Sequence, residues 1–124
     1  MNDVAITHFL KPIQPFLDEE GVAEISINKT KEIWVEKFGQ MQRHEIPALD
    51  FNHLRMLANL IAEYSQQTIG EDTPLLSATI PGGYRIQVIL PPVVENETVA
   101  ISIRKPALLD MSLEDYKNLG AFRS

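Results

Sequence analysis

Hydrophobic residues follow a helical spacing in two parts of the chain. Between residues 3 and 17 they recur three or four positions apart, which predicts a helix or a pair of helical turns. Pro12 lacks an N–H group and crowds the preceding turn, so we expect a break near it. A second helix is predicted to start after Asp50, whose side chain can cap an exposed N–H group. The same spacing continues toward Thr68 and should end before Gly70.

Six shorter segments are rich in alternating or β-branched residues, which is typical of strands. They are residues 22–27, 32–37, 40–46, 75–80, 84–90 and 98–104. Tight turns are expected at Gly39 and at Pro81-Gly82-Gly83. A last short helix is expected over residues 112–119, with Gly120 just after it.

The order of these elements is helix, three strands, helix, three strands and helix. It does not alternate strand and helix as βαβ units do. The pattern therefore predicts an α+β domain, with a mostly antiparallel sheet of about six strands and helices packed on it.

The charge balance argues against nucleic acid as a direct partner. The chain has 11 basic and 17 acidic residues, for a net charge of −6, and no cysteine. Phosphate-backbone binding normally needs a broad basic face. Residues 81–105 are an exception, since they hold Arg85, Arg104 and Lys105 against only Glu95 and Glu97. A small basic region on an acidic domain can hold an anion. The N-terminus has no pattern of a signal peptide, and no segment has the pattern of a membrane span.

Most catalytic patterns are missing. The chain has no Gly-x-x-x-x-Gly-Lys-Ser/Thr loop and no Gly-x-Ser-x-Gly motif. His8, His44 and His53 have no metal-ligand spacing and are interpreted as surface or boundary residues. The carboxylate pairs at 18–19 and 71–72 are interpreted as parts of solvated turns rather than an acid and base pair. No catalytic residue and no metal site is therefore predicted.

Two arginines remain as candidate site residues. Arg85 begins a predicted strand after the Pro-Gly-Gly turn, and Arg104 ends the next predicted strand. If these strands are antiparallel neighbours, the start of one lies beside the end of the other. The two guanidinium groups would then converge, and their planar donors suit phosphate oxygens. The alternative is that each arginine pairs with a surface carboxylate, which is a common arrangement.

The chain resembles the N-terminal domain of the VirB-type type IV secretion traffic ATPases, which are hexameric ATPases of the secretion superfamily. The resemblance covers roughly residues 15–124. Its main motifs are Pro81-Gly82-Gly83 before Arg85, Pro91-Pro92, the run from Ile101 to Pro106, Val22-x-Glu24-Ile25-x-Ile27-Asn28, and Trp34-Val35-Glu36.

The resemblance implies that residues 1–106 form a PAS-like N-terminal domain. Residues 107–124 would begin a linker toward a RecA-like ATPase domain that this chain lacks. In the family, ATP with Mg²⁺ binds between the two domains, and N-terminal arginines reach toward the phosphates; they correspond here to Arg85 and Arg104. Six subunits of the family form a ring at the cytoplasmic face of the inner membrane. This ring powers substrate export or pilus assembly.

The function implied for this chain is nucleotide sensing and oligomerisation within such an ATPase. Its partners would be the RecA-like domain, neighbouring subunits of a homo-hexamer and other channel components. The parent protein would hydrolyse ATP, whereas this chain alone would be inactive and would hold no cofactor. Two other functions stay open: an independent PAS-like sensor of a small ligand, and a protein-interaction module whose arginines are only surface charge.

Overall fold

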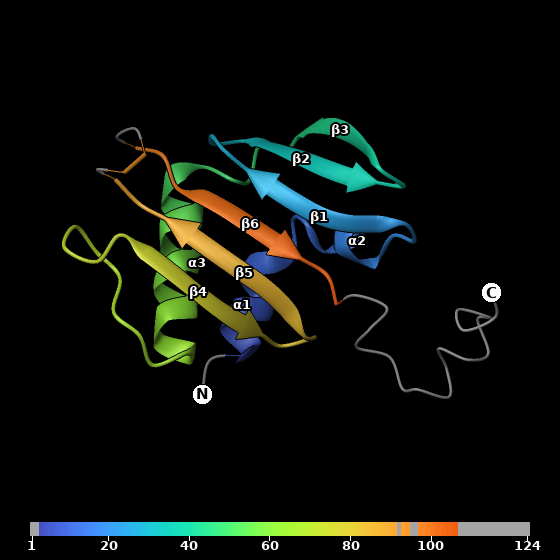
Figure 1. Ribbon diagram of the computed structural model, residues 1–124. Helices are drawn as coiled ribbons and strands as arrows, with labels where there is room; N and C mark the ends of the chain where they lie inside the picture. The colour runs from blue at the N-terminus through green and yellow to red at the C-terminus, as the bar shows by residue number, and fades with distance from the viewer. Residues whose placement is uncertain (1–2, 92, 95–96, 107–124) are drawn as a thin grey trace.

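The computed structural model describes residues 3–91, 93–94 and 97–106 (Figure 1). The helices are α1 (Asp3–Leu10), α2 (Gln14–Asp18) and α3 (Phe51–Tyr64). The strands are β1 (Val22–Ile27), β2 (Glu32–Lys37), β3 (Gln40–Glu45), β4 (Leu75–Ile80), β5 (Tyr84–Ile89) and β6 (Ala100–Arg104). The helix predicted over residues 112–119 lies outside the described residues.

The ends of the helices are set by proline, by a side-chain cap and by backbone angles. The break predicted near Pro12 separates α1 from α2, and Pro15 is tolerated in the first turn of α2 because that turn needs no N–H donor. Asp50 caps α3 as predicted, since its Oδ1 accepts a 2.8 Å hydrogen bond from the backbone N–H of His53. The helix ends at Tyr64 rather than near Thr68, because Gln66 takes a positive φ of 58° that no helix continues.

The six strands form one antiparallel sheet in the order β3-β2-β1-β6-β5-β4. The predicted fold class is therefore confirmed. Strand β6 begins at Ala100 rather than at residue 98. Strands β1 to β3 and strands β4 to β6 are two local meanders, and the β1–β6 pair joins them into a single sheet.

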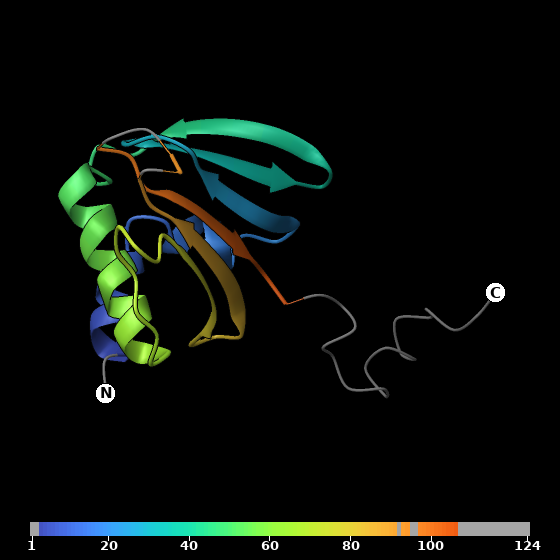
Figure 2. The same ribbon diagram turned by 60° about the vertical axis from the view of Figure 1, so that its left-hand side comes forward.

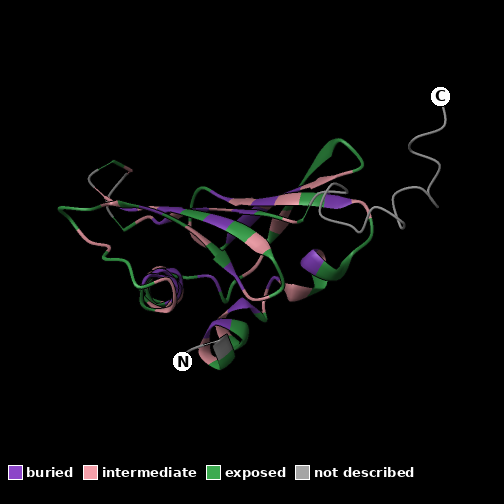
Figure 3. Ribbon diagram, turned by 60° about the horizontal axis from the view of Figure 1, so that its bottom comes forward, coloured by how far each residue is buried: buried purple, intermediate pink, exposed green. Residues whose placement is uncertain are grey.

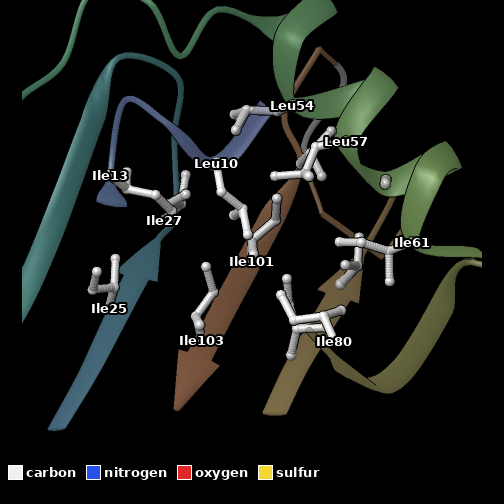
Figure 4. Close-up of a cluster of buried hydrophobic side chains, with 14 of the residues drawn as sticks. Leu10, Ile13, Ile25, Ile27, Leu54, Leu57, Ile61, Ile80, Ile101 and Ile103 are labelled. Atoms are coloured by element: carbon white, nitrogen blue, oxygen red, sulfur yellow. The ribbon is translucent and has the colours of Figure 1, made fainter. Parts of the chain in front are cut away.

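The core lies between the sheet and the helices, which all cover the same face of the sheet (Figures 1 and 2). Buried residues gather on the sides of the sheet and helices that face each other (Figure 3). In Figure 4 Ile61 and Leu57 of α3 approach the side chains of Ile80 and Ile101. Each such aliphatic side chain contributes about 1.5–3 kcal/mol when fully buried, so this layer holds the helices to the sheet.

No helix among the described residues lies over the opposite face of the sheet, which we call the open face. The strands have the alternation that a half-buried sheet requires, with apolar side chains inward and polar ones outward. No helix among the described residues has both the length and the apolar character needed to cross a membrane.

Candidate functional site on the open face of the sheet

Arg85 and Arg104 are direct neighbours on the open face. The register of β5 against β6 places Arg85 opposite Arg104, and both residues are exposed. The prediction that antiparallel pairing brings these two arginines together is confirmed. Directly opposite residues in an antiparallel pair have Cβ atoms about 4.5–5.5 Å apart, so one multivalent anion can contact both.

The turn before Arg85 depends on glycine. Gly82 and Gly83 have φ angles of 94° and 80°, in the left-handed region that residues with a Cβ rarely adopt. The N–H of Gly83 donates a 3.0 Å hydrogen bond to the carbonyl of Ile80. The chain thus reverses within a few residues, and Arg85 takes its place at the start of β5 on the outer side of the sheet.

Arg104 has an acidic partner, as the alternative interpretation anticipated for each arginine. Its Nη2 lies 3.2 Å from Oε1 of Glu24, the residue opposite it on β1. The other carboxylate oxygen of Glu24 accepts a 2.8 Å hydrogen bond from the hydroxyl of Ser102. The side chain of Arg104 nevertheless stays 69% exposed. It is paired but remains accessible to a ligand.

Arg85 differs from Arg104 in this respect. Within the described part of the chain, no carboxylate forms an ion pair with Arg85. Lys105 is turned elsewhere, since its Nζ donates a 3.1 Å hydrogen bond to the backbone carbonyl of Glu19. Among the described residues, the cationic groups available on this part of the open face are therefore the two guanidiniums, of which Arg104 is paired with Glu24.

A shallow hollow of about 570 Å³ lies over β4, β5 and β6 beside these arginines. Its outward polar side chains are Ser77, Thr79, Arg85, Gln87, Ser102 and Arg104. Hydroxyls, an amide and two guanidiniums can all donate hydrogen bonds to oxyanions. The donor set fits phosphate groups, and the hollow is open to solvent on its outer side.

A second charged group lies on the same face, on strands β2 and β3. Glu32 is 7% exposed, and it accepts a hydrogen bond from Nε of Arg43. That bond is the main reason that the pKa of Glu32 lies below its ordinary value of 4.5. Arg43 also reaches Glu45 at 3.3 Å. Because two carboxylates satisfy Arg43, this cluster serves the packing of the hairpin rather than an anion.

The histidines take ordinary positions. His53 packs its ring on that of Phe9, and its Nε2 lies 2.7 Å from the carbonyl of Phe9. His44 packs against Phe16 of α2. Among the described residues no group of three His, Asp or Glu side chains is placed to hold a metal ion.

The partnership between Glu24 and Arg104 was not predicted from the sequence. The alternation in residues 22–27 is enough to put Glu24 on the polar face of its strand. The alternation does not show which strand pairs with this one. Arg104 lies 80 residues after Glu24 in the sequence. Local patterns contain no signal for that pairing.

Comparisons with known proteins agree with this fold. The chain is 45% identical to the type IV secretion system protein VirB11 of Bartonella henselae, over 91% of this chain and 32% of that protein. It is 36% identical to the type IV secretion system protein PtlH of Bordetella pertussis, over 86% of this chain and 33% of that protein. A search of protein-family profiles finds no match.

A solved structure shares the fold. The crystal structure of the VirB11 ATPase from the Brucella suis type IV secretion system, in complex with sulphate, superposes with a TM-score of 0.86 at 34% identity. The match covers 98% of this chain and 36% of that one. The chain thus spans about a third of the length of the relatives that it matches. Sequence identity and fold together place the chain in the VirB11 family of type IV secretion ATPases, as its N-terminal domain.

Proposed function

We propose that this domain senses nucleotide for a type IV secretion ATPase, through Arg85 and Arg104 contacting the terminal phosphate of ATP. The parent protein would bind ATP with Mg²⁺ and hydrolyse it, and a RecA-like domain would supply the rest of the pocket. The free energy of ATP hydrolysis would drive substrate export or pilus assembly.

One observation carries the proposal: Arg85 and Arg104 lie directly opposite each other on the open face of the sheet, and both are exposed. Two like charges directly opposite each other repel and weaken the sheet. An anion bound between them removes that repulsion. A guanidinium also donates two parallel hydrogen bonds to phosphate oxygens, which favours phosphate over a simple halide.

The same arrangement gives the domain a way to respond to hydrolysis. A terminal phosphate held by the ATPase domain attracts both arginines and keeps the sheet close to it. After hydrolysis and phosphate release the attraction weakens, and the two domains separate. A ligand shifts such an equilibrium only by its difference in affinity for the two states, and that difference resides here in the two guanidiniums.

The test uses the full-length ATPase with Arg85→Ala, Arg104→Ala and the double variant. Loss of an arginine that contacts phosphate is expected to weaken ATP binding or turnover by at least about tenfold. The reason is that a hydrogen bond to a charged group contributes about 1.5–3 kcal/mol. Arg55→Ala is the matched control, since Arg55 lies on α3 and donates its hydrogen bond to Asn59. Equal nucleotide affinity and equal turnover in all variants would refute the proposal.

The assembly implied by the family is part of the same proposal. We infer that six parent subunits form a ring, that the ring lies at the cytoplasmic face of the inner membrane, and that this domain contacts its neighbours and other channel components. Native mass spectrometry of the full-length protein tests the ring directly. A stable monomer or dimer with full ATPase activity would contradict it.

A further inference from the structure

We propose that Glu24 is a positioning residue that competes with phosphate for Arg104, so that the site holds its anion loosely enough to release it. The inference rests on the proposed phosphate contact of Arg85 and Arg104. Glu24 is then a third charged residue at the site, and its carboxylate competes with the nucleotide phosphate for Arg104.

The three residues form one row across the sheet. The register pairs Glu24 of β1 with Arg104 of β6, and Arg104 with Arg85 of β5. All three lie on the open face, in the order negative, positive, positive. Arg104 therefore sits between a carboxylate on one side and a like charge on the other, and both neighbours favour its turning toward Glu24.

The carboxylate is held in place for this contact. The hydroxyl of Ser102 donates to Oε2 at 2.8 Å while Nη2 of Arg104 lies 3.2 Å from Oε1. The side chain of Glu24 is 24% exposed, against 69% for that of Arg104. The acidic group is thus the fixed partner, and the guanidinium is the one that is free to move to a ligand.

Phosphate bound between the two arginines affects the contact of Arg104 with Glu24 in one of two ways. If Arg104 turns to the phosphate, its ion pair with Glu24 is lost. If Arg104 contacts the phosphate and Glu24 at the same time, the carboxylate and the phosphate lie close together and repel each other. Both cases lower the affinity for the anion. When the anion leaves, the ion pair between Glu24 and Arg104 forms again and reduces the repulsion between the two arginines.

The experiment measures the affinity of the full-length ATPase for inorganic triphosphate, by isothermal titration calorimetry. Glu24→Gln keeps an acceptor for Ser102 but removes the charge. We expect it to tighten triphosphate binding about two- to fivefold, the size of an exposed ion pair. In an Arg104→Gln background the same change is expected to have no effect, since the competition requires Arg104.

Glu71→Gln is the matched control. Glu71 is exposed in the segment between α3 and β4, away from the row of Glu24, Arg104 and Arg85, and the variant makes the same change in net charge. If Glu71→Gln tightens triphosphate binding as much as Glu24→Gln does, or if Glu24→Gln still tightens binding in the Arg104→Gln background, the effect is one of general charge and the role of Glu24 is wrong.

The outcomes separate this inference from the function on which it rests. If Arg85→Ala and Arg104→Ala weaken triphosphate binding while Glu24→Gln leaves it unchanged, the phosphate contact stands and the competition is wrong. If Arg85→Ala and Arg104→Ala leave the triphosphate affinity of the full-length ATPase unchanged, the phosphate contact itself is wrong and the competition fails with it.

Discussion

Arg85 of β5 lies directly opposite Arg104 of β6, so the sheet carries a like-charge pair in one of its cross-strand positions. Such a pair costs the folded state free energy that an oppositely charged or neutral pair would not. The sheet also places Glu24 opposite Glu36 and Glu32 opposite Glu45, but there a neighbouring strand supplies a cation, Arg104 for Glu24 and Arg43 for Glu32.

The first prediction is that Arg85→Gln stabilises the isolated domain. Removing one of two opposed charges is expected to raise the free energy of unfolding by about 0.2–1 kcal/mol, measured by urea denaturation. The gain should shrink as salt is added, because salt screens exposed charges. Arg85→Lys keeps the charge and is expected to bring no gain. A loss of stability in Arg85→Gln would mean that the arginine has a stabilising partner.

The second prediction concerns pH and the pair of Glu32 with Arg43. The hydrogen bond from Arg43 lowers the pKa of Glu32 in the folded chain below 4.5. The unfolded chain therefore binds this proton more tightly than the folded one. The stability that the pair contributes is present above pH 4.5 and is lost as the pH falls through the folded-state pKa.

Glu32→Gln tests this sign. The variant cannot ionise at this position, so its stability deficit relative to the parent should be full at about pH 7 and should narrow by about pH 3. Urea unfolding at both pH values gives the comparison. A deficit that is the same at both would exclude an ionic contribution from Glu32.

A third prediction follows from the cap of α3. Asp50→Ala removes the acceptor for the His53 N–H and is expected to cost about 0.5–2 kcal/mol of stability. Asp50→Asn retains a side-chain oxygen and should cost much less. Thermal unfolding followed by circular dichroism ranks the three proteins. An equal loss in both variants would assign the effect to the charge of Asp50 rather than to its hydrogen bond.

The fourth prediction compares two positions of α3 that differ in burial. Ile61 is fully buried against the sheet, whereas Met56 is 45% exposed. Ile61→Ala leaves a cavity and is expected to cost about 2–5 kcal/mol. Met56→Ala should change stability by no more than about 0.5 kcal/mol. Similar losses at both sites would contradict the placement of the core between α3 and the sheet.

Much of the fold follows from local pattern. Alternation and turn residues locate all six strands, and Asp50 locates the start of α3. The end of α3 was missed because the helical spacing of apolar residues runs on while Gln66 leaves the helical region of backbone angles. Backbone angles at a helix end depend on packing that a periodic pattern does not contain.

The candidate site was predictable only in part. A short turn at Pro81 forces β4 and β5 together, and the antiparallel order then brings Arg85 beside Arg104 if β6 follows as their neighbour. Glu24 enters through the β1–β6 pairing, which depends on how the two meanders meet in the core. Long-range pairing of this kind is decided by packing of buried faces and not by any local sequence signal.

The strand order has a consequence for synthesis of the protein. On the ribosome β1 emerges early and pairs with β2, but its other edge stays open until Ala100–Arg104 has left the exit tunnel. An unpaired edge invites association with other nascent chains, and distant pairings form slowly. Because Arg104 is the last residue of β6, the ion pair with Glu24 can form only after all six strands have been translated.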